Sequence, residues 1–133
     1  MTAAPIPSID ANDLRAEPRI EGGQIALRFA GSADSRSEVA IEELLARVHE
    51  QAVGLAVREV SVDLRDCDFV NSSCFKAFVV WLERIQDLPP NEQYKLCFYS
   101  DETKAWQRRS LGALSCFAIE LVRIETKASG ASR

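Results

Sequence analysis

The sequence predicts a single α/β domain with a mixed, partly parallel sheet of four to five strands and helices packed against it. Its 133 residues are enough for one domain, with 47% hydrophobic and 27% charged residues, an ordinary globular balance. Along the chain, hydrophobic periods of two alternate with periods near 3.6, which indicates strands alternating with helices. That order is typical of a sheet that contains parallel strands.

Alternating apolar and polar residues mark the strands. A pair of glycines, Gly22 and Gly23, tolerates positive φ and predicts a two-residue hairpin turn between the first two strands. The expected strands, in chain order, cover residues 19–20, 25–29, 60–65, 94–98 and 119–122.

Apolar residues at helical spacing predict three helices between the strands. The first helix is expected to begin at Ser35, because Ser35 and Glu38 have the spacing of a capping box. The second follows a run of capping residues at 71–73, and the third begins with the acidic turn 100–102.

The ends of the chain show no such periodicity. We expect residues 1–14 and 127–133 to form flexible tails around a domain at 15–126. No apolar run approaches the roughly 20 residues of a membrane span, and the N-terminus lacks the layout of a secretion signal. We therefore expect a cytoplasmic protein that does not associate with membranes.

Charge and cysteine usage exclude further classes. The net charge of −4 lacks the basic footprint that a general nucleic-acid binder needs. The four cysteines form no C-x-x-C pair, and His49, expected on a solvated helix face, is the one histidine in the sequence. We therefore expect no metal site and no cofactor, with the cysteines acting as small buried hydrophobes.

The most informative segment is 62–76, where a strand leads into a short loop and two serines begin an amphipathic helix. At this point the chain resembles the STAS family, whose best-known members are anti-sigma factor antagonists. The resemblance extends over about residues 18–125 and includes the order of the elements. The residues that carry it are Asp63-Leu64 at the end of the central strand, Phe69 before the loop, Ser72-Ser73 in place of the family's Asp-Ser-Ser-Gly turn, and Gly31 to Asp34 in place of its Gly-x-x-Asp.

The resemblance implies a non-catalytic switch that acts through protein–protein interaction. An anti-sigma factor with serine-kinase activity would bind the loop and phosphorylate Ser72, with Ser73 as the alternative acceptor. The unphosphorylated form would sequester the anti-sigma factor, and a phosphatase would reset the system. The expected partner-binding residues combine the loop with the polar face of the following helix: Asp34, Asn71, Ser72, Ser73, Cys74, Lys76 and Val80.

Two departures from the family pattern leave alternatives open. Asn71 replaces the usual aspartate and Cys74 replaces the usual glycine. One alternative is a STAS-like scaffold that is never phosphorylated, with Ser72 and Ser73 acting only as helix caps. Another is a thiol-based redox protein built on Cys74, because a cysteine in the first turn of a helix can have a lowered pKa.

Overall fold

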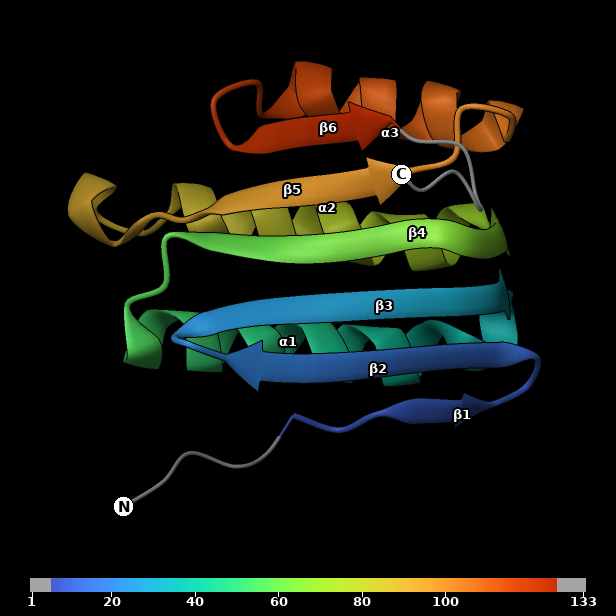
Figure 1. Cartoon of the computed structure of the whole chain (residues 1–133), viewed down its shortest axis with the longest axis horizontal. Helices are drawn as coiled ribbons and strands as arrows, with labels where there is room; N and C mark the ends of the chain where they lie inside the picture. Colours follow the sequence, from blue (N-terminus) through green and yellow to red (C-terminus); the bar gives the residue numbers. More distant parts are fainter. Residues whose placement is uncertain (1–5, 127–133) are drawn as a thin grey trace.

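A computed structural model describes residues 6–126 as one mixed sheet of six strands with three helices on one face (Figure 1). The predicted fold class is confirmed, with one strand more than expected. The elements are β1 (Ile9–Ala11), β2 (Leu14–Glu21), β3 (Gln24–Ala33), a 3-10 turn (Ser35–Ser37), α1 (Glu38–Leu55), β4 (Glu59–Val70), α2 (Ser72–Gln86), a second 3-10 turn (Pro90–Glu92), β5 (Lys95–Ser100), α3 (Ala105–Phe117) and β6 (Val122–Thr126).

The strands lie in the sheet in the same order as in the chain. β1, β2 and β3 pair antiparallel, and Gly22 and Gly23 form the predicted turn with φ of +58° and +76°. β3, β4, β5 and β6 pair parallel, with one helix in each connection. The carboxyl ends of these strands and the helix N-termini that follow them therefore share one edge of the sheet.

The sheet begins earlier than the sequence predicted. Ile9–Ala11 pairs with the start of β2, so the expectation of a flexible tail over 1–14 is wrong for the part from Ile9 onward. Asn12 and Asp13 form the connecting turn with φ of 55° and 70°, a conformation that their short polar side chains tolerate. Residues 1–5 and the expected C-terminal tail at 127–133 lie outside the described residues.

Two helices begin later than predicted, because acidic side chains cap the turns that precede them. The Asp34 carboxylate, not Ser35, accepts the backbone N–H of Arg36 at 2.9 Å, and this caps the 3-10 turn before α1. The Asp101 carboxylate likewise accepts the backbone N–H of Thr103, so the turn predicted to start the third helix precedes α3.

β4 runs further than the alternation predicted and reaches Val70. At two irregularities β4 advances one residue more than β3, between Arg28 and Ala30 and between Gly31 and Ser32. These extra residues break the period of two, as β-bulges do. Gly31 has φ of +94°, and a Cβ there would lie 2.1 Å from the Asp13 carbonyl oxygen, so the close approach requires glycine.

The core fills the space between the sheet and its helices. Its largest fully buried side chains include Trp81 on α2 and Tyr94 before β5. The indole N–H of Trp81 donates to the Tyr94 hydroxyl at 2.8 Å, and that hydroxyl lies 2.6 Å from Nδ1 of His49 on α1. The expectation that His49 lies on a solvated face is wrong, because this contact draws the ring into the helix–sheet interface.

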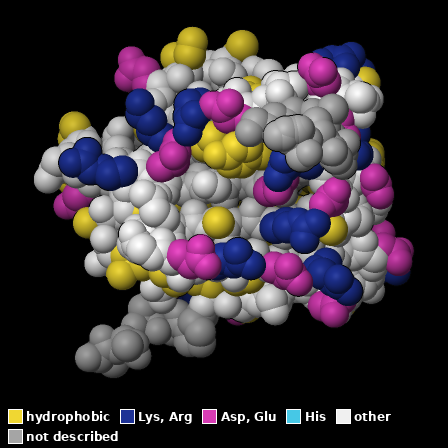
Figure 2. Space-filling view, viewed as in Figure 1, with side chains coloured by type: hydrophobic (Ala, Val, Ile, Leu, Met, Phe, Trp, Pro, Cys, Tyr) yellow, Lys and Arg dark blue, Asp and Glu magenta, His cyan; other side chains and the backbone are white. Residues whose placement is uncertain are grey.

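The opposite face of the sheet carries charged side chains in place of helices (Figure 2). Arg65 pairs with Asp63 at 2.8 Å, Arg123 pairs with Glu59 at 2.9 Å, and Arg28 pairs with Asp66. Opposite charges thus compensate one another on this face, within β4, between β3 and β4, and between β4 and β6. Separately, within residues 6–126 no helix combines the length and the apolar composition that crossing a membrane requires.

Candidate functional site

The site is the turn between β4 and α2, at the edge where the parallel strands end. Asn71 caps α2, because its side-chain oxygen accepts the backbone N–H of Cys74 at 2.9 Å. The backbone N–H of Asn71 donates to the Ala33 carbonyl at the end of β3, also at 2.9 Å. The turn is therefore held from both sides, by its own helix and by the neighbouring strand.

Ser72 and Ser73 are the first two residues of α2, and both are exposed. Among residues 6–126 neither hydroxyl has a hydrogen-bond partner, because the capping bond is made by Asn71. The expectation that these serines act as helix caps is therefore wrong. Their hydroxyls remain free, at a helix N-terminus that favours negative charge.

Cys74 lies one residue further and points the other way, into the protein. It is fully buried, and its thiol donates to the Asp34 carbonyl oxygen at 3.1 Å. Burial raises the pKa of the Cys74 thiol, and the nearby carboxylates of Glu38 and Asp34 raise it further. The redox alternative needed a lowered pKa and an accessible sulfur, so the structure contradicts both of its premises.

Asp34 contacts the turn through its backbone carbonyl, which accepts the Cys74 thiol. Its carboxylate is already bound by Arg36. Arg36 binds it with Nη2 at 2.7 Å and reaches Asp13 at 3.3 Å. The hydrogen bonds from Arg36 lower the pKa of Asp34. Asp34 thus keeps its charge at the edge while helping to fix the start of the 3-10 turn.

Two side chains next to the serines add to the accessible surface. Phe69, near the end of β4, is 49% exposed, which is unusual for a large aromatic residue. Lys76 is exposed one helical turn after Ser72, and it has no ion-pair partner within residues 6–126. The sequence placed Phe69 before the site but gave no signal that its ring would face outward.

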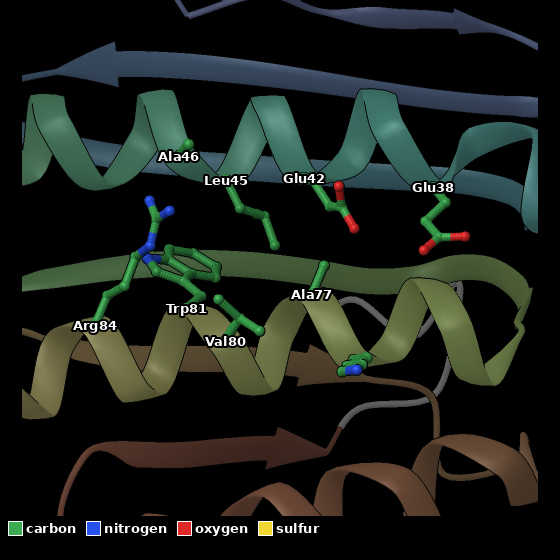
Figure 3. A pocket seen from close by; sticks show the side chains of 9 residues that line it. Glu38, Glu42, Leu45, Ala46, Ala77, Val80, Trp81 and Arg84 are labelled. Carbon is green, nitrogen blue, oxygen red and sulfur yellow. The ribbon is translucent and has the colours of Figure 1, made fainter.

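Lys76 and Val80 follow the serines along α2 and line a groove between α1 and α2. Figure 3 shows Val80 on α2 beside this groove. The cavity measures about 280 Å³. Glu38 and Glu42 project into it from α1, and Arg84 projects from α2. The sequence placed Lys76 and Val80 on the polar face of this helix, but it gave no sign that the α1 carboxylates lie across from them.

The structure therefore brings Asp34, Asn71, Ser72 and Ser73 to one edge, and Lys76 and Val80 continue from that edge along the groove. The expectation that Cys74 contacts a partner is wrong, because its side chain is fully buried. A mixed sheet with helices on one face and two free serines at the start of α2 has the architecture predicted for a STAS-like domain.

Comparison with known proteins supports this architecture at the level of the fold. No family model matches the chain, and neither does any curated protein. A crystal structure described as an anti-sigma factor antagonist from Mycobacterium paratuberculosis matches with a TM-score of 0.60 over 82% of this chain and 86% of that chain. The two sequences are 17% identical. The chain thus has the fold of that anti-sigma factor antagonist, and the predicted STAS-like fold is confirmed.

Proposed function

We propose that this protein is a non-catalytic regulator of the anti-sigma factor antagonist type, switched by phosphorylation of Ser72. The observation that carries the proposal is the free, exposed hydroxyl of Ser72 at the first position of α2. Because Asn71 supplies the cap, a kinase could modify this hydroxyl without breaking a bond that holds the helix.

Phosphate on Ser72 would change the surface without requiring a change of fold. It adds about −1.5 to −2 charges and three acceptor oxygens. The helix N-terminus stabilises that charge, and Lys76 lies one turn further along the same helix. A partner surface shaped for a neutral serine would lose the interaction through repulsion and desolvation.

The proposed partner is an anti-sigma factor with serine-kinase activity, and a phosphatase would reverse the modification. The proposed contact surface comprises the turn, the exposed edge around Asp34, and the start of the groove at Lys76 and Val80. The neutral Asn71 removes a carboxylate from this surface, so the cognate kinase would recognise a less acidic turn than the family's Asp-Ser-Ser-Gly.

The test is a quantitative pull-down from the native cells with four forms of the full chain: the wild type, Ser72→Ala, Ser72→Glu and Ser73→Glu. We expect Ser72→Ala to retain an ATP-dependent kinase as partner and Ser72→Glu to lose it. Intact-mass spectrometry of the protein isolated under several stresses should show one added phosphate, which Ser72→Ala abolishes.

Equal capture of the partner by Ser72→Ala and Ser72→Glu would reject the switch. Loss with Ser73→Glu alone would move the acceptor to Ser73. A protein that never carries phosphate would leave the unphosphorylated scaffold as the function, an alternative that the replacements Asn71 and Cys74 favour.

A further inference from the structure

Two rows of side chains form the walls of the groove between α1 and α2. Residues four apart lie one above another on a helix, so each row is a ridge along its helix axis. The ridge on α1 consists of Glu38, Glu42 and Ala46, and the ridge on α2 consists of Lys76, Val80 and Arg84.

The floor between the ridges is apolar and already packed. Leu45, Ala77 and Trp81 form it, and none of them is more than 7% exposed. Val80 rises from the α2 ridge and remains 39% exposed. The groove is therefore preformed, with one apolar residue left at its rim for an occupant to cover.

The two walls of the groove carry charges of opposite sign that do not form ion pairs with one another. The carboxylates of Glu38 and Glu42 on α1 and the guanidinium group of Arg84 on α2 project into the groove (Figure 3). Lys76 adds an ammonium group to the lining on α2. Within residues 6–126 none of these four groups belongs to an ion pair, whereas Arg28, Arg65 and Arg123 on the open face of the sheet each pair with a carboxylate of β4. The groove is thus where unpartnered charges of both signs face one another across an apolar floor.

We infer that the groove binds one amphipathic helix of a partner protein, with basic residues along one flank and acidic residues along the other. The apolar stripe of that helix would cover Val80 and the floor, its basic flank would meet Glu38 and Glu42, and its acidic flank would meet Lys76 and Arg84. Each ridge spans nine residues, or about 12 Å along the helix axis, so the docked part would be a short helix of two to three turns.

The shape of the groove selects this occupant over a second copy of the chain. A twofold dimer would place the same patch on both sides of the interface. Two concave grooves facing one another would leave a void, while a convex helix fills the space between two ridges. The small area also fits a transient regulatory contact better than a permanent assembly.

This inference rests on the part of the proposed function that makes the chain a protein-binding module, and it does not require phosphorylation. Ser72 does not line the groove. A Ser72→Glu variant should therefore bind a groove ligand as the wild type does, even if it loses the kinase. The failure of one proposal is thus distinguishable from the failure of the other.

The test uses three synthetic helical peptides of about 14 residues that share one Leu/Ala stripe. One peptide has a Lys flank and a Glu flank, one has Lys on both flanks, and one has Glu on both. Binding to the full chain is measured by fluorescence anisotropy, and the site is located from the methyl NMR signals of Val80, Ala46 and Leu45. We expect the mixed peptide to bind about tenfold more tightly than either of the others and to shift these signals.

Charge reversal on one wall should then change the preference in a defined direction. The double variant Glu38→Lys/Glu42→Lys makes both walls basic and should prefer the all-Glu peptide. Lys76→Glu/Arg84→Glu makes both walls acidic and should prefer the all-Lys peptide. As a matched control, Arg109→Glu on the exposed surface of α3 should leave the order of affinities unchanged.

The inference is overturned if the three peptides bind equally, if none binds, or if the methyl signals of the groove do not move. Val80→Asp serves as a second variant, because its site is already partly exposed and its circular dichroism should match the wild type. Val80→Asp should lower the affinity for the peptide with one Lys flank and one Glu flank about tenfold. A concentration-dependent dimer that Val80→Asp dissociates in sedimentation velocity would assign the groove to a second copy and also reject the inference.

Discussion

The turns that follow β4 and β5 occupy equivalent places in the fold but satisfy their polar groups differently. Each follows a parallel strand and leads into a helix at the same edge of the sheet. In the first, Asn71 makes a single capping bond, and the hydroxyls of Ser72 and Ser73 stay free among the described residues. In the second, the polar side chains bond to the protein itself.

Asp101 and Gln107 close the second turn. The Asp101 carboxylate, 3% exposed, accepts the backbone N–H and the hydroxyl of Thr103 at 2.9 and 2.6 Å, and it pairs with Lys104 at 3.3 Å. The fully buried Gln107 amide accepts the Asp101 N–H and donates to the carbonyls of Leu64 and Cys67 at 2.6 and 3.0 Å. These bonds join α3 to the irregular end of β4.

The turn after β5 is therefore a closed turn, whose polar groups bond within the protein, and the turn after β4 is an open turn, whose serine hydroxyls are accessible to a partner. Polar groups that already bond within the protein gain little from a visiting molecule, whereas free hydroxyls can be modified or contacted at no structural cost. The neighbouring closed turn also holds the end of β4, and so it helps to fix the position from which the open turn is presented.

The largest effect is expected at the closed turn. Gln107→Ala would remove three hydrogen bonds of a fully buried amide, two to carbonyls of β4 and one from the Asp101 N–H, and should lower the free energy of unfolding by about 2–4 kcal/mol, measured by urea denaturation. Gln93→Ala is the matched control, because its amide also bonds two carbonyls but in an exposed turn, at Gln86 and Leu88. A loss of similar size in both variants would contradict the special role of Gln107.

Acid should weaken the closed turn and spare the open one. Hydrogen bonds from Thr103, followed by those from Lys104, lower the pKa of Asp101 to about 2, below the value of about 3.9 in an unfolded chain. The carboxylate therefore contributes stability above about pH 4, and this contribution disappears as the pH falls through about 2. The difference in unfolding free energy between wild type and Asp101→Asn should shrink over that interval, while the difference for Asn71→Ala stays flat.

The cap of the open turn should contribute less than the closed network. Asn71→Ala removes the bond to the Cys74 N–H and should cost about 1 kcal/mol in thermal or urea unfolding. Asn71→Asp keeps an oxygen in the same place and should stay within about 0.5 kcal/mol of the wild type. An unchanged Asn71→Ala variant would mean that another group caps α2.

The smallest effect is expected at the serines. Ser72→Ala and Ser73→Ala should each change the free energy of unfolding by less than about 0.5 kcal/mol, because neither hydroxyl holds the helix. A loss of about 1 kcal/mol for either one would restore the capping role that the structure assigns to Asn71.

The features that the sequence predicted correctly depend on local pattern. Alternation located β3, β4 and β5, and the Gly22-Gly23 pair located the hairpin. The last strand, predicted at 119–122, instead begins at Val122, because residues 118–121 form a turn. The serine turn emerged because a buried strand, a polar loop and an amphipathic stripe follow one another directly in the chain. Helical spacing also placed Lys76 and Val80 on one face of α2.

The features that it missed depend on contacts between distant residues or on very short elements. β1 has three residues, too few to show a period, although Asn12-Asp13 is a turn signal that could have indicated a hairpin. The opposing wall of the groove comes from α1, about 40 residues before α2. Nor does local pattern indicate that His49 meets Tyr94, which follows it by 45 residues.

The contact between His49 and Tyr94 depends on the protonation state of the imidazole ring. The Tyr94 hydroxyl accepts the Trp81 indole N–H and has one hydrogen of its own to give. When it donates that hydrogen to Nδ1 of His49, the imidazole carries its own hydrogen on Nε2. A second proton on the ring would turn Nδ1 into a donor, so the tyrosine hydrogen could no longer be given to His49. Burial, followed by the positive charge of Arg84, lowers the pKa of His49 and thereby keeps the ring neutral. The tie between α1, α2 and β5 is therefore complete above about pH 6.5 and is lost as the medium becomes more acidic.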